Sequence, residues 1–290
     1  MRKLLPPLLI APALLLGSHL APAGATLPSM VESGHEHANV AVQAPFTLAT
    51  FNVLGHSHTA PGGNKSGFES GTTRIRLAVE ALNGHDVDVV GFQEFEEIQR
   101  DAFLDEVRGA WGVWHEDDRN VRNSIAWRKS TFDFVRGETI LIPYFRGILR
   151  EMPYVLLEHK ASGQQMWFAN FHLPANSGRP GNEEAYRDQG TQKHIDLAHE
   201  LRNTGQAVFF TGDMNEKEEY FCKFTANGDM HASNGGSNDG GRCLPPQRPN
   251  RTRIDWIFGS QGAQFSDYFV DESALVQRIS DHPLVLARVY

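Results

Sequence analysis

The chain has 290 residues, with 27 lysine and arginine residues against 35 aspartate and glutamate residues, and a formal net charge of −8. Because an acidic surface attracts polyanions poorly at long range, this composition argues against a protein that coats DNA generally. Any binding of nucleic acid would need a local basic patch. The length and the lack of a repeat or linker in the sequence fit one domain.

The first residues have the composition of an export signal. Met1-Arg2-Lys3 precedes an apolar run from Leu4 to Leu20, and small residues that fit an A-x-A cleavage site follow it. The run is too short to span a bilayer comfortably, so we expect a cleaved signal peptide over residues 1–25 and a secreted product. Cleavage removes two basic residues and no acidic ones, which changes the net charge to −10. Residues 26–44 carry few large apolar groups and predict a flexible leader.

From residue 45 onward, short apolar strands alternate with polar or glycine-containing loops. Strand-forming alternation and compact apolar runs predict strands at residues 46–53, 87–92, 124–127, 154–159, 166–172, 207–211, 254–258 and 284–289. Apolar residues at helical spacing predict helices over residues 74–82, 95–107 and 182–202. Strands therefore dominate, and residues 45–290 are predicted to form one α/β (α+β) domain of packed sheets covered by helices.

Two cysteines, Cys222 and Cys243, lack the accompanying spacing of a zinc site. In an exported protein such an isolated pair is expected to form a disulfide. The bridge would close a glycine- and asparagine-rich loop of about twenty residues, which the chain-entropy model stabilises by about 3 kcal/mol.

Polar residues fall in or just after the predicted strands, where side chains can converge at one edge of a packed sheet core. The residues in question are Asn52, Glu94, His172, Asp213, Asn215, Asp255 and His282. Each has an ordinary structural explanation when taken alone. His172 is supported by Asn170, two residues away on the same strand face. The other histidines, among them His56 and His58, lack such support.

The polar residues lie within six motifs whose order resembles the endonuclease/exonuclease/phosphatase superfamily, which includes pancreatic-type deoxyribonucleases, bacterial sphingomyelinases and inositol-polyphosphate phosphatases. The motifs are Ala49-Thr50-Phe51-Asn52-Val53, Gly91-Phe92-Gln93-Glu94, Asn170-Phe171-His172-Leu173, Gly212-Asp213-Met214-Asn215, Arg253-Ile254-Asp255-Trp256 and Ser280-Asp281-His282. The resemblance implies a deoxyribonuclease I-like, four-layer architecture, with a two-sheet β-sandwich flanked by helices. It also implies a metal-dependent phosphoesterase.

The resemblance assigns a metal-binding role to Glu94, with Asn52 and Asp281 as contributors. Hydrolysis of a phosphate ester builds negative charge on oxygen, and hard oxygen ligands suit Mg²⁺ or Mn²⁺, which would act as Lewis acid and template. Ca²⁺ is a further candidate, as a structural ion. The sequence leaves open whether one metal ion or two are needed.

The remaining motif residues are expected to handle protons and substrate. The resemblance makes His282 the general base, with Asp255 holding its tautomer. Asp213 and Asn215 would orient the nucleophile or the phosphate. His172 would donate to the phosphate or the leaving oxygen, with Asn170 beside it as a phosphate-binding residue. Ser280 receives no role.

Three classes of substrate remain open, and the enzyme is expected to act on one of them as a monomer without a stable protein partner. Nucleic acid, the preferred class, would use basic residues from Arg119, Arg122, Arg128, Lys129, Arg248, Arg251 and Arg253. A phospholipid head group would suit a sphingomyelinase-like enzyme with an apolar wedge at Ile140 to Phe145. A small phosphate ester, as in an inositol-type phosphatase, is the third. A non-catalytic secreted binding protein is disfavoured because no motif residue is lost.

Overall fold

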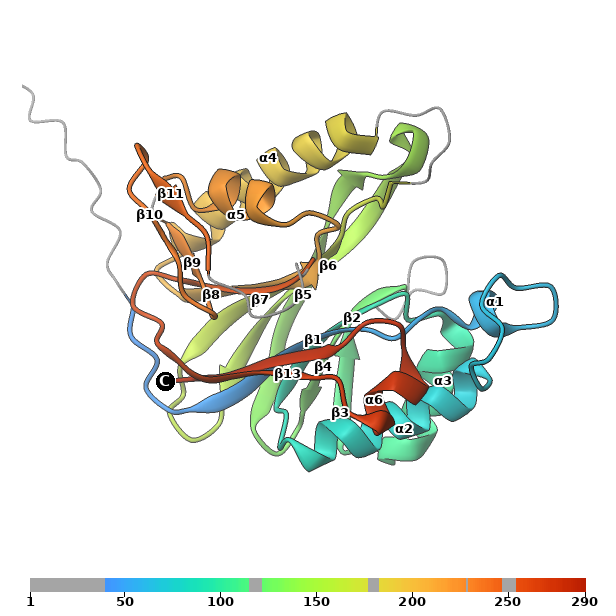
Figure 1. The fold of residues 1–290 in the computed structure, drawn as a ribbon. Coiled ribbons are helices and arrows are strands. Elements are labelled where there is room, and N and C mark those ends of the chain that lie inside the picture. The colour runs from blue at the N-terminus through green and yellow to red at the C-terminus, as the bar shows by residue number, and fades with distance from the viewer. Residues whose placement is uncertain (1–39, 115–121, 177–182, 228, 247–253) are drawn as a thin grey trace, which may run out of the picture. The chain divides into compact units, whose positions relative to one another are not determined.

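The computed structural model describes residues 40–114, 122–176, 183–227, 229–246 and 254–290. Two six-stranded mixed sheets pack face to face, with helices on their outer faces (Figure 1). The strand order is β13-β14-β1-β2-β4-β3 in the first sheet and β5-β6-β7-β8-β12-β9 in the second. The predicted two-sheet α/β architecture is therefore confirmed.

The elements follow the predicted order and add several that the sequence did not predict. The first sheet contains β1 (Phe46–Asn52), β2 (Val89–Gln93), β3 (Trp111–Trp114), β4 (Asn123–Arg128), β13 (Phe265–Asp271) and β14 (Leu284–Val289). The second sheet contains β5 (Phe132–Pro143), β6 (Leu149–His159), β7 (Gln165–His172), β8 (Ala207–Asp213), β9 (Met230–Ala232) and β12 (Asp255–Ser260). A separate pair consists of β10 (Ser237–Asn238) and β11 (Cys243–Leu244). The helices are α1 (His56–Thr59), α2 (Gly71–Gly84), α3 (Glu97–Val107), η1 (Phe145–Gly147), α4 (Glu183–Arg202), α5 (Glu218–Phe224) and α6 (Ala274–Ile279).

Each sheet contains one parallel strand pair, and these two pairs position the site. β1 and β2 are parallel and are connected through α2, whereas β7 and β8 are parallel and are connected through α4. The other pairs within the two sheets are antiparallel. Because the carboxyl ends of a parallel pair lie at the same sheet edge, Asn52 lies beside Gln93 and His172 lies beside Asp213.

Three layers of apolar side chains hold the sandwich together. The layer between the sheets includes Phe46, whose ring makes edge contacts with Phe132, Phe168 and Phe209. A second layer lies between the first sheet and α2, α3 and α6, and a third lies between the second sheet and α4 and α5. Both faces of each sheet are thus covered, which explains why central strands such as β1 and β8 are buried along their whole length.

The apolar run from Ile140 to Phe145 is the end of a long edge strand and its turn. Ile142, Pro143 and Tyr144 are buried, whereas Leu141 is 46 % exposed. Ile140 and Phe145 also pack against the apolar layer between the second sheet and α4 and α5, so the run as a whole is not a free membrane wedge. β5 itself was not predicted, because most of its residues are exposed and many are polar.

The predicted signal peptide lies outside the described residues, as does most of the predicted leader. Residues 40–44 are described, and they contact the domain: Gln164 donates from Nε2 to the Ala41 carbonyl and accepts at Oε1 from the Gln43 amide. Val40 and Val42 pack against the layer between the sheets. This last part of the leader is therefore held on the domain. Among the described residues, no helix is long and apolar enough to cross a membrane.

The predicted disulfide is present. Cys222 in α5 is joined to Cys243 at the start of β11. Asn238 in β10 donates from Nδ2 to the Cys222 carbonyl at 2.8 Å, which adds a second link between the loop and α5. The bridge therefore secures a segment that has few apolar groups of its own.

Gly91 in β2 gives the first prediction, because the two sheets approach closely there. An added Cβ would lie 2.1 Å from Thr211 Oγ1 and 2.5 Å from Asn170 Oδ1. We expect Gly91→Ala to lower the free energy of unfolding by about 1–3 kcal/mol through overpacking. Gly84→Ala is the matched control, because no atom lies within 4 Å of a Cβ there. Denaturant unfolding of both variants tests this, and equal stability of the two would contradict the close approach.

Candidate active site

The predicted site residues gather at one edge of the sandwich, at the ends of strands from both sheets. Asn52 ends β1, and Glu94 directly follows β2; from the second sheet, His172 ends β7 and Asp213 ends β8. Asp255 begins β12 opposite Asp213, and His282 precedes β14. The strand register thus brings together side chains from distant parts of the chain.

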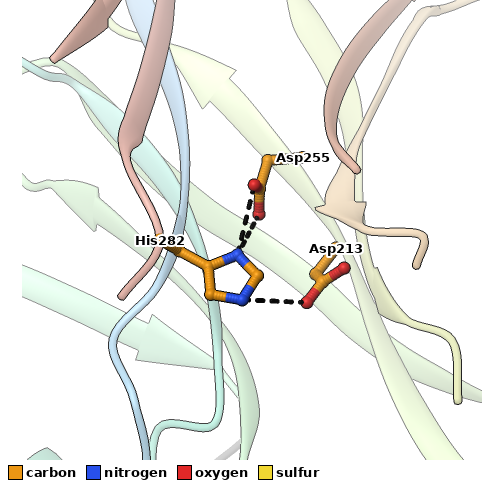
Figure 2. A group of neighbouring side chains, drawn as sticks. All are labelled: Asp213, Asp255 and His282. Carbon is orange, nitrogen blue, oxygen red and sulfur yellow. Dashed lines mark hydrogen bonds and ion pairs between the residues drawn. The ribbon is translucent and has the colours of Figure 1, made fainter. Parts of the chain in front are cut away.

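His282 lies between two buried carboxylates (Figure 2). Its Nδ1 is 3.0 Å and 3.2 Å from the two carboxylate oxygens of Asp255. Its Nε2 lies 3.7 Å from Asp213 Oδ2 on the opposite side of the ring. Asp213 is 1 % exposed and Asp255 is 4 % exposed, so both carboxylates act on the ring with little screening by water.

Burial and charge oppose each other at this group. Burial lowers the pKa of His282, but the Asp255 and Asp213 carboxylates outweigh it and raise the pKa to about 10. Burial also raises the pKa of Asp213 above its ordinary value, and the nearby Asp255 adds to this, while His282 and His172 oppose it. The group therefore holds protons tightly in the absence of a bound cation.

Ser280 fixes the segment that carries His282. Its hydroxyl donates to the Asn52 carbonyl at 2.6 Å and accepts from the His282 amide at 3.1 Å. The segment after α6 is thereby tied to the end of β1. Ser280, which the sequence left without a role, positions His282.

Asn52 connects carboxylates from the two sheets. Its Nδ2 donates to Glu94 Oε1 at 3.2 Å and to Asp213 Oδ2 at 3.1 Å, while its Oδ1 accepts from the Leu54 amide at 3.1 Å. The amide nitrogen therefore faces the carboxylates, so Asn52 orients two candidate metal ligands.

The surroundings of Glu94 stabilise its negatively charged form. Its Oε2 accepts from the Gly55 amide at 2.9 Å and lies 3.3 Å from His58 Nε2. Burial raises its pKa, but His172, the Gly55 amide, Asn52 and His58 together hold the pKa below its ordinary value. The residue has a φ of 56°, an uncommon backbone conformation that aims the side chain into the site.

Asp281 differs from the prediction in its partner. Its Oδ2 forms an ion pair with Lys65 Nζ at 2.5 Å. Lys65 belongs to the segment of residues 55–65, here named the cap, which contains α1 and also carries His58. Sequence reasoning missed both cap residues; the available signal was two histidines within six residues of Asn52, in a segment with no strand or long helix.

Asn170, for which the sequence predicted a phosphate-binding role, links the two sheets. It is fully buried, and its Nδ2 donates to the carbonyls of Phe92 and Ser124. Its Oδ1 accepts from Gln93 Nε2 at 2.7 Å and from Thr211 Oγ1 at 3.2 Å. These four bonds use the whole capacity of the amide.

Asn215 lies partly exposed at the site, with its Nδ2 donating to the Leu173 carbonyl at 2.8 Å. Its backbone amide donates to Asp213 Oδ1 at 2.9 Å. The backbone amide of Asn215 thus holds one oxygen of Asp213 in place. The bond from Nδ2 to the Leu173 carbonyl fixes the side-chain amide and so orients its oxygen.

His172 contacts groups that the sequence did not predict. Its Nε2 lies 3.5 Å from Asp213 Oδ2, and its Nδ1 lies 3.5 Å from the Tyr144 hydroxyl. The guanidinium of Arg150 stacks 4.2 Å from the centre of the Tyr144 ring. An aromatic ring and a cation are therefore placed next to His172.

The basic residues considered for nucleic-acid binding divide into three groups. Arg119, Arg248, Arg251 and Arg253 lie outside the described residues. Arg128 donates to the Val87 carbonyl and stacks on Trp111, so it serves the fold, and the backbone amide of Lys129 beside it donates to the Ala110 carbonyl. Arg122 lies at the site, where its carbonyl accepts from the Phe95 amide and its side chain pairs with Glu96 at 3.2 Å.

Arg74 is a fully buried cation that binds the loops around the site. Its Nη1 donates to the carbonyls of Val53 and Ile279, and its Nη2 donates to the Gly55 carbonyl. Burial lowers its pKa to about 10, while Asp281, Glu94 and Glu96 oppose that shift. The guanidinium therefore stays charged at neutral pH and joins the cap to the end of α6.

The donor set fits a hard divalent cation. Glu94, Asp213 and Asp255 offer carboxylate oxygens, and the contacts of Asp213 and Asp255 described above are with histidines and amides. Among the described residues, one group of three acidic or histidine side chains places its ligand atoms within 4.8 Å of one another: Asp213, Asp255 and His282. Burial raises the pKa of Asp213, and added positive charge, which Mg²⁺ or Mn²⁺ supplies, would stabilise its carboxylate form.

Solved structures with the same fold come from several organisms. An endonuclease/exonuclease/phosphatase from Bacteroides vulgatus has a TM-score of 0.68 at 17 % identity, covering 86 % of this chain and 99 % of that one. A mannosyl-6-phosphatase from Bacteroides thetaiotaomicron has a TM-score of 0.62 at 18 % identity, covering 84 % and 99 %. D. rerio TDP2 complexed with a single-strand DNA product has a TM-score of 0.62 at 17 % identity, covering 85 % and 99 %.

A search of curated proteins finds no match. A family model described as the Endonuclease/Exonuclease/phosphatase family matches residues 49–282, which span all six motifs and most of the chain. The chain belongs to the endonuclease/exonuclease/phosphatase family of phosphoester hydrolases.

Proposed function

We propose that this phosphoester hydrolase is an exported phosphodiesterase that cleaves nucleic acid with Mg²⁺ or Mn²⁺ and uses His282 as its general base. The observation that carries the proposal is the His282 imidazole held between Asp255 and Asp213. A buried carboxylate on Nδ1 fixes the tautomer and leaves Nε2 to face the reacting groups.

In this proposal, water loses its proton to His282 Nε2. Asp213 lies on that side of the ring, and Asn215 holds the second oxygen of Asp213. A water molecule bound to these groups would be oriented toward the phosphorus before the proton is transferred. Asp255 then stabilises the imidazolium that forms.

His172 is the proposed donor to a phosphoryl or leaving oxygen. Its ring lies between Asp213 and the Tyr144 hydroxyl, so both of its nitrogens have partners that can set the tautomer. Asn170, two residues earlier, fixes the end of β7 against the first sheet and so positions His172.

When bound, a divalent ion supplies positive charge that stabilises the phosphoryl oxygens and lowers the pKa of His282 toward neutrality. The proposed residues that hold it are Glu94 and the neighbouring carboxylates, which Asn52 orients. The number of metal ions, one or two, stays open. A structural Ca²⁺ stays a prediction from the sequence.

Arginine side chains near His172 support a polyanionic substrate. Arg150 reaches the site over Tyr144, and Arg122 lies next to the loop that carries Glu94. Guanidinium groups match phosphate oxygens in planar, bidentate contacts. The likeness to TDP2 with its DNA product agrees with this class. Export is supported by the disulfide, which is typical of proteins in oxidising compartments.

The activity prediction concerns His282 and Glu94. We expect the purified protein to hydrolyse plasmid DNA and bis-p-nitrophenyl phosphate with Mg²⁺ or Mn²⁺, and EDTA to abolish the activity. His282→Ala should lower kcat by about 10²–10⁴-fold, because general-base catalysis is lost. Glu94→Gln should require much higher metal concentrations for the same rate.

His85→Ala is the control, since His85 pairs with Asp271 in another part of the fold. Parallel assays on RNA, sphingomyelin and mannose 6-phosphate separate the classes of substrate. Turnover confined to sphingomyelin or to the sugar phosphate would reject the nuclease assignment, and full activity of His282→Ala on the preferred substrate would reject the mechanism.

The pH prediction follows from the raised pKa of His282. In metal-free protein, we expect the His282 ring to titrate near pH 10 because Asp255 and Asp213 favour the protonated form. Asp255→Asn should lower this pKa, since the first of these two carboxylates is neutralised. NMR of the histidine ring nitrogens in EDTA measures both values. Asp271→Asn is the control, and an unchanged His282 titration in Asp255→Asn would show that Asp255 does not act on the ring.

A further inference from the structure

The cap is fastened to the domain on the side of α2 and α3. The His56 amide donates to Gln99 Oε1 at 2.9 Å, and the Ser57 amide donates to Glu96 Oε2 at 2.9 Å. Arg74 in α2 donates to the Gly55 carbonyl and to the Thr59 hydroxyl. Three positions of the short helix α1 and the preceding Gly55 are thus fixed around His58, whose side chain is 35 % exposed.

The returning part of the cap closes on the His58 backbone. The Lys65 amide donates to the His58 carbonyl at 2.9 Å. Gly63 passes so close that an added Cβ would lie 2.2 Å from the same carbonyl oxygen. These contacts fix the backbone of His58 within the cap, next to Glu94. His58 is therefore not a freely rotating surface residue.

The contacts of the His58 ring indicate its tautomer. Nδ1 lies 2.7 Å from Asn64 Oδ1, and an amide oxygen can only accept, so Nδ1 donates. In a neutral imidazole, Nε2 then carries a lone pair. In that neutral form the Nε2 lone pair is directed at Glu94 Oε2, 3.3 Å away, whereas in the protonated form the same contact is an ion pair; in both forms Nε2 and Oε2 face each other across a short gap.

A spacing of this size is typical of two ligands on one metal ion. With metal–ligand bonds of about 2.1 Å, neighbouring ligand atoms are about 3.0 Å apart in an octahedral shell and about 3.4 Å apart in a tetrahedral one. The separation of 3.3 Å between His58 Nε2 and Glu94 Oε2 lies in this range. Solvent reaches both groups, so an ion has a path to them.

The partner of Asp281 supports the same conclusion. Asp281 was expected to contribute an oxygen to the metal, but Lys65 of the cap binds its Oδ2. The cap thus pairs Lys65 with Asp281, an expected oxygen ligand, and places the imidazole nitrogen of His58 next to Glu94.

We propose that His58 Nε2 is a metal ligand that shares the ion with Glu94 and replaces the expected contribution of Asp281. The proposal rests on the metal dependence proposed above. Because imidazole nitrogen suits transition metals better than Mg²⁺, the site selects Mn²⁺ over Mg²⁺.

Metal binding to the intact protein tests this without an activity assay. Isothermal titration calorimetry with MnCl₂ and with MgCl₂ gives both dissociation constants for the wild type, His58→Gln and His85→Gln. We expect His58→Gln to weaken Mn²⁺ binding by about tenfold or more and Mg²⁺ binding by less than about threefold. Pulsed EPR of the Mn²⁺-bound protein should lose one nitrogen coupling in this variant.

His85→Gln is the matched control, because the same substitution there removes a histidine that pairs with a carboxylate away from the site. It should leave both constants unchanged. Equal weakening of Mn²⁺ and Mg²⁺ in His58→Gln, with the nitrogen coupling retained, would assign His58 as a hydrogen-bonding partner of Glu94 and overturn the proposal. A wild-type protein that binds neither ion would reject the proposed metal dependence itself, and this inference with it.

Discussion

The Asn52 side-chain amide is the interaction on which the site depends. One nitrogen donates to Glu94, which follows a strand of the first sheet, and to Asp213, which ends a strand of the second. Two carboxylates brought close together repel each other, and a shared donor between them reduces that repulsion while fixing their separation. The sandwich therefore does more than support the site, because the distance between the sheets sets the distance between the carboxylates.

That distance is determined by residues deeper in the sandwich. Gly91 allows β2 to approach Asn170 and Thr211, and the Asn170 amide then bonds to backbone and side-chain groups of the first sheet. Arg74 acts in the same way at the outer side, where its buried guanidinium binds three carbonyls from two separate segments. A buried cation is costly unless its donors are satisfied, and here its partners include the segments that carry His58 and His282. Loop geometry at the site is thus coupled to the core.

The sequence was sufficient for the sheet architecture and for the residues that end strands. Alternation and compact apolar runs located the central strands, because these are buried on both faces and flanked by polar loops. β5 and β13 escaped prediction since their exposed faces carry many polar residues, and α5 and α6 are too short for a helical period to be recognised. The motif order located the site residues, but not their contacts.

Contacts decide three roles that residue type could not. Asn170 has a polar side chain on the same strand as His172, yet three bonds to the opposite sheet and one to Thr211 of the neighbouring strand use its full hydrogen-bonding capacity. Ser280 had no expected role, and the tertiary fold makes its hydroxyl the link between the Asn52 carbonyl and the His282 amide. His58 lay in an irregular segment without support from strand periodicity, and only the folded cap places it against Glu94. Such long-range placements are absent from local sequence patterns.

The charges at the site also make stability depend on pH and on bound cations. A histidine whose folded pKa is about 10 stabilises the fold at pH values below its unfolded pKa, and this contribution is lost as the pH rises through about 10. Asp213 has a raised folded pKa, so its ionisation costs stability as the pH rises above the ordinary range of an aspartate. The two effects are linked, because the imidazolium favours the Asp213 carboxylate and the carboxylate favours the imidazolium. A divalent ion bound to the carboxylates would replace the proton as the source of positive charge, stabilise the fold through binding and release His282 to accept a proton. Electrostatic repulsion between the buried carboxylates therefore favours the binding of a metal ion.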